Sequence, residues 1–350
     1  MPRKTTAGVV TLSAVAKAAG VSLATASRAI NGSVARTVGD ELSAKVRAVA
    51  AQLGYAPDAN AQAIARGATR TLGVAVNDLT DPYFAAIANG MMKASDERDL
   101  FLTLASIGNR SERLVEVVRA LDSLRVRAIL LVGGRERDGA WRDDLAEVIG
   151  RYRGRGGRVV TVGLDLPGLD RVLIDNAGGS ALLADELFRL GYRRPILLAG
   201  PELHSTANLR TEAFESRARE LGCRIPKTNV ISCDFTHEGG HEALRLALEL
   251  GARGDVVVAS NDVMALGAMS SARAAGIRIG EDLAFAGFGD ITALRDVEPG
   301  LTTVHVPAGE VGERAVELAV SGPGDGTGSV RIPVHVVVRA STPAKSGVTS

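Results

Sequence analysis

The sequence predicts an all-α helix-turn-helix head followed by a larger α/β body built on parallel sheets. Three observations predict it: short amphipathic helical patterns around a glycine turn within the first 55 residues, strand-like runs alternating with helical patterns after residue 70, and an uneven distribution of charge. The 350 residues are too many for one small domain, and 46% hydrophobic residues exclude a largely disordered chain.

The charge differs between the two parts of the chain. Residues 1–70 hold nine basic and three acidic side chains, a net charge of +6, whereas the other 280 residues hold 32 basic and 37 acidic ones, a net charge of −5. A basic segment joined to a mildly acidic body is typical of a nucleic-acid-binding module attached to a second unit. An ordinary solvated surface could carry the same charges, so the motifs have to distinguish the two interpretations.

The head has the pattern of three short helices. Thr11 is expected to cap the first, whose apolar face is Leu12, Val15, Ala16 and Ala19. Gly20 ends this helix and supplies a tight turn, and Ser22 caps a second helix that ends at Asn31. A third helix is predicted at about 39–53. Two short helices around a glycine turn form a helix-turn-helix.

The body alternates strand and helix patterns. Strands are predicted at Leu72–Val76, Phe101–Ala105, Ala128–Val132, Val159–Val162, Ile196–Ala199, Val256–Ala259, Leu283–Gly287 and Thr303–Val306. Helices are predicted near 83–98, 111–124, 177–190, 208–221, 238–250 and 262–275. Such alternation favours parallel sheets, and ligands of open α/β sheets bind beyond the carboxyl ends of the strands.

The run VTLSAVAKAAGVSLATASRAIN resembles the DNA-binding head of the lactose-repressor (LacI/GalR) family of bacterial transcription regulators. The segment LGYAPDANAQAIARGATRTLGV is similar to the junction and hinge helix of that family, and the resemblance continues to about residue 340. It implies a head at 1–57, a hinge at 58–70 and a two-lobed, periplasmic-binding-protein-like domain for effector binding and dimerisation at 71–340. Lobe 1 is expected at about 71–172 and 302–328 and lobe 2 at about 175–300 and 331–340, with chain crossings near 172–175, 300–302 and 328–331. Residues 341–350 are predicted to be a disordered tail.

The resemblance implies that the second helix lies in the DNA major groove. Leu23, Ala24 and Arg28 would then face base edges, and Arg28 is the best reader because a guanidinium that grips guanine bidentately gives about 1–3 kcal/mol of discrimination. Residues expected at or near the phosphates are Thr11, Ser22, Thr25, Ser27 and Asn31. Ser43 stands where the family often has a basic residue, so one backbone contact is expected to move to Arg36 or Lys45.

The hinge is implied to fold in the minor groove when two chains meet over DNA. The residues expected to contact DNA there are Asn60, Ala61, Ile64 and Ala65. Ile64 occupies the position of the family's intercalating leucine, whose insertion kinks the duplex. A plain linker is the alternative interpretation of this segment.

The resemblance also implies an effector site in the cleft between the lobes. Its expected residues are Tyr83, Phe84, His204, Thr206, Arg210, Phe235, Asn261 and Asp290. Asn261 would reach the ligand while Asp262 caps the following helix. Gly163 and Gly289 stand where the family often has hydroxyl-binding Asp, so Asp165 or Asp290 would compensate, or an acidic effector would be held by Arg210. The effector is therefore expected to be a sugar or a sugar acid.

Other classes of protein are less well supported. The run HEGGH at 237–241 matches a zinc-protease pattern, but its two glycines weaken the required helix and no third ligand can be assigned. We therefore expect no metal, no cofactor and no enzymatic activity. A plain sugar-binding protein of the same architecture would not need residues 1–70. The N-terminus lacks a signal peptide, no apolar run could span a membrane, and the two cysteines suit a reducing cytoplasm.

The sequence therefore predicts a cytoplasmic homodimeric regulator, most simply a repressor, that binds a near-palindromic operator in double-stranded DNA. The tail has no heptad repeat, which favours a dimer over a tetramer. A small molecule in the cleft would change operator affinity. Whether that molecule is an inducer or a corepressor stays open.

Overall fold

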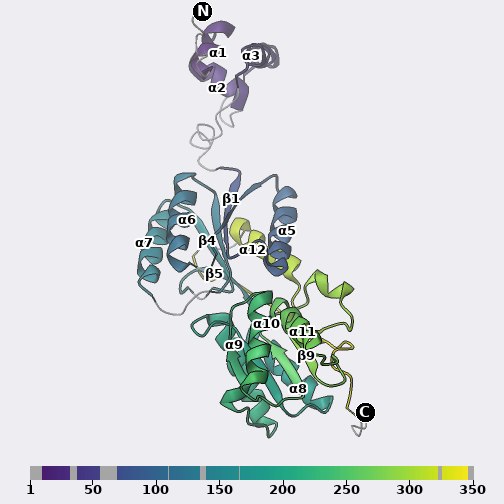
Figure 1. The fold of residues 1–350 in the computed structure, drawn as a ribbon. Coiled ribbons are helices and arrows are strands. Elements are labelled where there is room, and N and C mark those ends of the chain that lie inside the picture. The colour runs from purple at the N-terminus through teal and green to yellow at the C-terminus, as the bar shows by residue number, and fades with distance from the viewer. Residues whose placement is uncertain are drawn as a thin grey trace, which may run out of the picture. The chain divides into compact units, whose positions relative to one another are not determined.

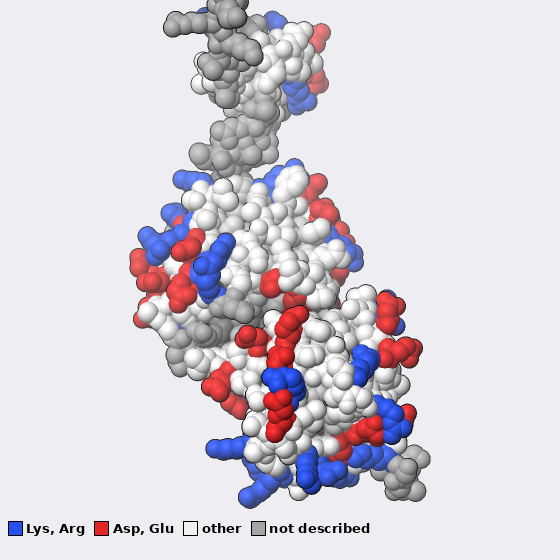
Figure 2. Space-filling model, in the orientation of Figure 1, with Lys and Arg blue, Asp and Glu red and all other residues white. Residues whose placement is uncertain are grey.

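The computed structural model describes residues 10–31, 38–55, 69–108, 110–134, 139–164, 166–321 and 325–345. The chain divides into two compact units, Met1–Arg70 and Thr71–Ser350, whose elements are labelled in Figure 1. Figure 2 shows basic and acidic side chains interspersed on the surface of the second unit. Several predicted positions lie outside the described residues, namely Arg36, Asn60, Ala61, Ile64, Ala65 and Asp165.

The first unit contains helices α1 (Leu12–Ala19), α2 (Leu23–Asn31) and α3 (Asp40–Gln52). The Thr11 side chain accepts a hydrogen bond from the Ala14 amide, which confirms it as the cap of α1. Gly20 ends α1 in the left-handed region at φ 70°, and the Ser22 hydroxyl accepts from the Thr25 amide at 3.1 Å. A small core joins the three helices, made of Val15, Ala16, Ala19, Ala26, Ala29, Val46 and Ala50.

The first lobe of the second unit is a parallel six-stranded sheet in the order β11-β5-β4-β3-β1-β2. Its strands are β1 (Thr71–Val76), β2 (Phe101–Ser106), β3 (Ala128–Val132), β4 (Arg158–Val162), β5 (Asp170–Ile174) and β11 (Ser329–Ile332). Its helices are α5 (Pro82–Asp96), α6 (Ser111–Ser123), α7 (Trp141–Gly154) and α12 (Ala308–Ser321), of which α6 and α7 cover one face and α5 and α12 the other (Figure 1). Because side chains alternate along a strand, Val74 packs toward α5 and α12 while Ala75 packs toward α6 and α7.

The second lobe has a six-stranded sheet in the order β12-β10-β9-β8-β6-β7, in which only β12 is antiparallel to its neighbour. The strands are β6 (Pro195–Ala199), β7 (Val230–Ser232), β8 (Val256–Ala259), β9 (Ala284–Gly289), β10 (Thr302–His305) and β12 (His335–Val337). Helices α8 (Asn176–Arg189) and α9 (Ser205–Glu220) cover one face, and α10 (His237–Glu249) and α11 (Asp262–Ala274) cover the other. Two 3-10 turns lie at Lys227–Asn229 and Thr292–Asp296.

The chain passes between the lobes after β5, after β10 and after β11. Two of the predicted crossings are therefore wrong. Thr302–His305 pairs with β9 in the second sheet, so the chain leaves lobe 2 at 306–307 and not at 300–302. Residues 329–332 pair with β5 in the first sheet, so the last crossing is at 333–334 and not at 328–331. Pairing between strands distant in sequence decides these boundaries, and local patterns do not reveal it.

The prediction of a disordered tail from residue 341 is wrong for its first residues. Ser341 and Thr342 are buried, although both are polar. The Ser341 hydroxyl donates to the Phe285 carbonyl at 2.6 Å and accepts from the Thr302 amide at 2.8 Å. Lys345 makes an ion pair with Asp255 at 2.7 Å. These internal bonds replace the water contacts that polar side chains would have in a free tail.

The glycines of the HEGGH run have a packing role. A Cβ atom at Gly240 of α10 would lie 2.0 Å from the Met264 carbonyl oxygen of α11, and one at Gly267 would lie 1.9 Å from the His237 carbonyl oxygen. The two helices therefore meet backbone to backbone. Within the described residues, no group of three or more His, Cys, Asp or Glu side chains could hold a metal ion. The same part of the chain contains no helix with the length and apolar character needed to cross a bilayer.

Candidate DNA-reading helix and effector pocket

Helix α2 is anchored on one side and open on the other. Ala26 and Ala29 are buried in the core of the first unit, whereas Leu23 is 54% exposed and Ala24 is also exposed. On α3, the Ser43 hydroxyl donates to the Ala29 carbonyl oxygen at 3.2 Å. This bond fixes the end of α2 and gives Ser43 a role inside the unit. The arrangement leaves the first turn of α2 accessible to a groove of DNA.

Polar side chains along α2 are partly ordered by their own helix. The Arg28 Nε donates to the Ala24 carbonyl oxygen at 3.0 Å, which draws the guanidinium back along α2. The Ser22 and Thr25 hydroxyls lie 2.8 Å apart, and Ser27 is half-buried. Asn31 is the last residue of the helix. Lys45 is exposed on α3 and is a candidate for a phosphate contact.

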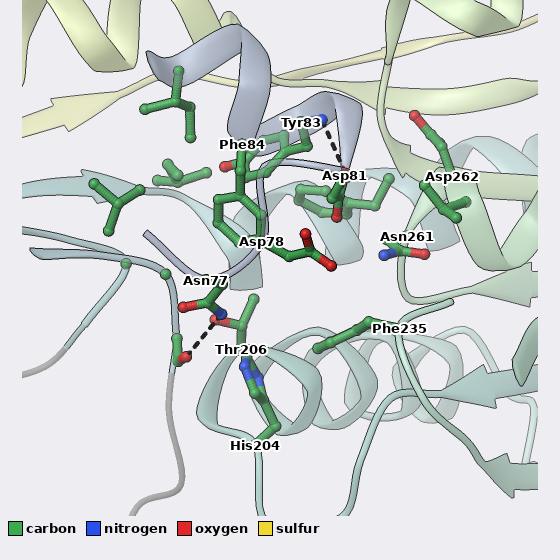
Figure 3. Close-up of a pocket in the computed structure, with 18 of the residues that line it drawn as sticks. Asn77, Asp78, Asp81, Tyr83, Phe84, His204, Thr206, Phe235, Asn261 and Asp262 are labelled. Atoms are coloured by element: carbon green, nitrogen blue, oxygen red, sulfur yellow. Dashed lines mark hydrogen bonds between the residues drawn. The ribbon is translucent and has the colours of Figure 1, made fainter. Parts of the chain in front are cut away.

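A pocket lies where the carboxyl ends of the strands of both lobes meet. Its empty space is about 990 Å³, part of which is open solvent. Seven of the eight predicted effector residues line it: Tyr83, Phe84, His204, Thr206, Arg210, Phe235 and Asn261. The residues that line it without having been predicted include Asn77, Asp78, Asn176, Asp262 and Phe288. Figure 3 shows side chains converging from both lobes.

Arg210 of α9 is buried and already bonded to the protein. Its Nε donates to Asn176 Oδ1 at 2.9 Å, and its Nη1 donates to the Ser260 carbonyl oxygen at 2.6 Å. The guanidinium lies over the Phe288 ring, 3.7 Å from the ring centroid. Burial lowers the pKa of Arg210 to about 10, so it stays charged at neutral pH. Arg210 thus forms part of a rigid pocket wall.

Aromatic rings form two further parts of the wall. His204 and Phe235 meet edge to face with ring centroids 4.9 Å apart, and Tyr83 and Phe84 do so at 5.3 Å. Burial raises the pKa of Tyr83 to about 12, which keeps its hydroxyl protonated as a donor. Such rings can stack on a sugar ring or contact a cation.

The prediction that Asp262 caps α11 is wrong. Asn261 is the cap of α11, because its Oδ1 accepts from the Met264 amide at 2.8 Å. Asp262 is buried and accepts from the Thr303 hydroxyl at 2.6 Å and from the Ile291 amide at 3.0 Å. Burial raises the pKa of Asp262 to about 6. Asn261 still presents its Nδ2 group toward the pocket.

Asp290 does not line the pocket, which corrects the prediction that it compensates for Gly289. Its carboxylate accepts from Arg339 at 2.6 Å and lies 2.8 Å from His305 Nδ1. Burial opposes ionisation, but the bonds from Arg339 and His305 lower the pKa of Asp290 below its ordinary value. At Gly289, with φ 137°, a Cβ atom would lie 3.1 Å from Asp262 Oδ2. At Gly163, with φ 71°, it would meet nothing closer than 3.9 Å, so the pocket has extra room there.

Comparison with known proteins identifies the family. The model of bacterial regulatory proteins of the lacI family matches residues 11–58, and that of the periplasmic binding protein-like domain matches residues 184–342. The ribose operon repressor of Escherichia coli (strain K12) is 30% identical over 314 residues, which cover 89% of this chain and 92% of the repressor. The chain belongs to the LacI family. It is therefore a DNA-binding transcriptional regulator.

Other LacI-family proteins match most of the chain. The repressor CytR of Escherichia coli (strain K12) is 27% identical, with coverage of 95% of this chain and 96% of CytR. The Lac repressor dimer bound to operator and the anti-inducer ONPF has a TM-score of 0.82 at 25% identity, covering 96% of this chain and 99% of that one. A LacI-family regulator from Enterococcus faecium with bound ribose has a TM-score of 0.67 at 25% identity, covering 79% and 100%.

Some pocket residues of this LacI-family chain carried a signal that went unused. Asn77 and Asp78 directly follow β1, so the rule that places ligands at the carboxyl ends of strands points to both. Asn176 follows β5, a strand that the apolar pattern does not reveal. No pattern in the sequence indicates that Phe288 supports Arg210.

Proposed function

We propose that the chain is a cytoplasmic homodimeric repressor that reads a near-palindromic operator through α2 and changes its operator affinity when a small molecule binds in the pocket. The observation that carries the proposal is the presence, in one chain, of an exposed recognition helix and a pocket lined from two lobes. No enzymatic activity is part of the proposal, and the relatives named above are transcriptional repressors.

The open face of α2 supports operator reading. Leu23 and Ala24 offer apolar contact to thymine methyl groups, and Arg28 offers a guanidinium to guanine. Two-fold symmetry of a dimer requires a two-fold site with half-sites about one helical turn or a multiple apart. The hinge residues Asn60, Ala61, Ile64 and Ala65 are proposed to add minor-groove contacts.

The position of the pocket supports allosteric control. Its walls come from α5, β3 and β4 of the first lobe and from α9 and α11 of the second, and three chain crossings connect the lobes. A ligand that contacts both lobes favours one relative orientation of the lobes, and only a difference in affinity between two orientations can shift operator binding. Coupling of about 1–3 kcal/mol is typical of such systems.

The proposed effector is a small hydroxylated molecule of sugar size. The aromatic walls, the Arg210 Nη2 group and the Asn261 Nδ2 group suit such a ligand. The solved relative with bound ribose and the CelR regulator in complex with cellobiose are consistent with it. The direction of control is decided by whether the ligand favours the DNA-binding orientation.

The test begins with an operator selected from random DNA by the purified protein, followed by footprinting. We expect a protected two-fold site whose affinity changes at least fivefold with one member of a panel of sugars and sugar derivatives. A selected site without two-fold symmetry would contradict the dimeric reading, and constant operator affinity across the panel would contradict control by a sugar-like effector.

A further inference from the structure

The pocket contains more acceptors and negative charge than a neutral sugar requires. Asp78, Asp81 and Asp262 line it together with a single described guanidinium, that of Arg210. In the view of Figure 3 the Asp78 and Asp81 carboxyl groups are drawn between the Phe84 ring and Asn261, and the charge of Asp78 acts on Asp81. Within the described part of the chain, neither Asp78 nor Asp81 forms an ion pair with a basic side chain. The open part of the pocket is therefore acidic.

Arg210 does not offset these carboxylates through direct bonds. Two of its three nitrogens donate to Asn176 and to the Ser260 carbonyl, and its flat face is covered by Phe288. An incoming carboxylate would therefore find much of the guanidinium fork in use, and it would also face Asp78 and Asp81. This geometry disfavours the acidic effector that the sequence left open.

Local structure accounts for one oxygen of each carboxylate. Asp78 Oδ1 accepts from the Thr80 amide at 2.9 Å, and Asp81 Oδ1 caps α5 by accepting from the Tyr83 amide at 2.9 Å. No described residue binds the second oxygen of either group. Burial and, to a smaller extent, the charge of Asp78 raise the pKa of Asp81, whereas the Tyr83 amide and the charge of Arg210 lower it.

Asn77 gives a second, independent indication of a donor-bearing ligand. Its side chain is 7% exposed and lines the pocket, and its Nδ2 lies 3.4 Å from the Gly134 carbonyl oxygen. Its Oδ1 is buried with no hydrogen-bond partner among the described residues. A buried acceptor without a donor costs about 1–3 kcal/mol, which a ligand N–H or O–H group would recover.

We propose that the effector carries a protonated amino group that binds between Asp78 and Asp81, so that the ligand class is a hydroxylated amine such as an amino sugar. The amino group donates to the second oxygen of each carboxylate, and the faces of the neighbouring rings of Tyr83 and Phe84 stabilise its charge. The hydroxyl groups of the ligand bind Asn261 and Asn77. This inference rests on the proposed function, because it refines the ligand of the same pocket.

The test compares ligands that share a skeleton and differ in charge. Calorimetry at pH 7 measures glucose, glucosamine and glucuronate, and then galactose, galactosamine and galacturonate. In at least one series the amino sugar is expected to bind about tenfold or more tightly than the neutral sugar, the acid is expected to bind more weakly, and added salt should reduce the amine's advantage. A response to both amino sugars no greater than that to their neutral partners, absence of any response included, overturns the proposal.

Variants of the two pocket carboxylates test whether these groups bind the amino group of the ligand. Asp78→Asn and Asp81→Asn retain the acceptor oxygens that bind the Thr80 and Tyr83 amides, so both should fold with unchanged melting temperature. In each variant the amino sugar is expected to bind less than about threefold more tightly than the neutral sugar, because a charge-assisted hydrogen bond is lost. The control Asp143→Asn, at an exposed acid on α7, should keep the parent's preference for the amino sugar. An unchanged preference in both pocket variants contradicts the assignment.

Two readouts separate this inference from the proposed function. If a neutral or acidic sugar releases or strengthens operator binding, the proposed regulatory function is supported and the proposed amine ligand is contradicted. If an amino sugar binds tightly and its binding depends on Asp78, but operator affinity does not change, the proposed amine ligand is supported and the proposed allosteric coupling is contradicted.

Discussion

The guanidinium of Arg210 lies 3.7 Å from the centroid of the Phe288 ring, and the same side chain bonds Asn176 and the Ser260 carbonyl. One residue thus connects α9, the start of α8, the end of β8 and the end of β9 at the wall of the pocket. A side chain held by three partners is a pre-formed part of the site, because little conformational freedom remains to be lost when a ligand binds.

Arg210→Lys should weaken effector binding by about tenfold or more, because lysine keeps the charge but cannot make both bonds at once. Operator affinity without effector should change less than about twofold, since the first unit is untouched. Calorimetry and fluorescence anisotropy measure the two affinities. Arg217→Lys, two turns along α9 at an exposed ion pair with Asp185, is the control and should behave like the parent. Ligand response equal to that of the parent in Arg210→Lys would show that Arg210 has no part in the site.

Arg28→Ala should remove base discrimination and keep non-specific DNA binding. The expected loss at the selected operator is about 1–3 kcal/mol, or roughly 5- to 150-fold in affinity, with relaxed preference at one base pair of each half-site. Lys45→Ala is the contrasting variant, because a phosphate contact should weaken all sequences alike and lower the salt dependence by about one ion. Binding to randomised operators reports both effects. An unchanged sequence preference in Arg28→Ala would exclude the assigned reading role.

Gly240→Ala should destabilise the body by about 1–3 kcal/mol, because its Cβ atom would lie 2.0 Å from a backbone oxygen of α11 that no side-chain rotation can move. Gly150→Ala is the matched control in α7, where a Cβ atom would meet nothing within 4 Å. There alanine should be neutral or stabilise by up to about 1 kcal/mol through its helix propensity. Urea unfolding measures both. Equal stability of the two variants would mean that α10 and α11 do not pack backbone to backbone.

Asp262 should make stability depend on pH between about 4 and 6. Its carboxyl has a pKa of about 6 in the folded chain against 3.8 as its ordinary value, because of burial. The folded state therefore holds a proton that the unfolded state has released, and stability falls as the pH rises through this window. A difference of two units corresponds to about 3 kcal/mol as an order of magnitude.

Asp262→Asn removes this titration. The difference in unfolding free energy between the parent and the variant, measured in urea at pH 4, 5, 6 and 7, should shift against the parent as the pH rises and become constant above about 6. Other groups titrate equally in both proteins and cancel from the difference. A difference that is constant over the whole range would contradict an elevated pKa for Asp262.

The sequence predicted best where local chemistry decides the structure. Thr11, Gly20 and Ser22 act as caps and turn through bonds to residues at most four positions away, so their roles follow from residue type and spacing. Helix α7 was not predicted because its apolar residues are separated by many charges, and only its packing beneath the sheet shows which side is buried. The sheet membership of Thr302–His305 depends on partners more than ten residues away.

The pocket follows the same rule. The aromatic and basic residues Phe84, Arg210 and Phe235 were predicted because the family resemblance places ligand contacts at their positions, and their chemistry suits a ligand. The prediction that Asp290 lines the pocket was wrong because its carboxylate binds Arg339, which lies 49 positions further along the chain. Asp262 does not cap α11, because its carboxylate binds the Thr303 hydroxyl of β10. In both cases a distant partner decided which way an acidic side chain turned.

If the pocket and the operator-binding surface are coupled, the operator must change the affinity of the pocket for its ligand. The affinity of the tightest-binding compound of the sugar and amino-sugar series is measured by calorimetry with the protein free and with the protein saturated with its selected operator. Coupling of about 1–3 kcal/mol predicts that the two dissociation constants differ by about 5- to 150-fold, and that the compound changes operator affinity by the same factor. Equal ligand affinity with and without operator would contradict it.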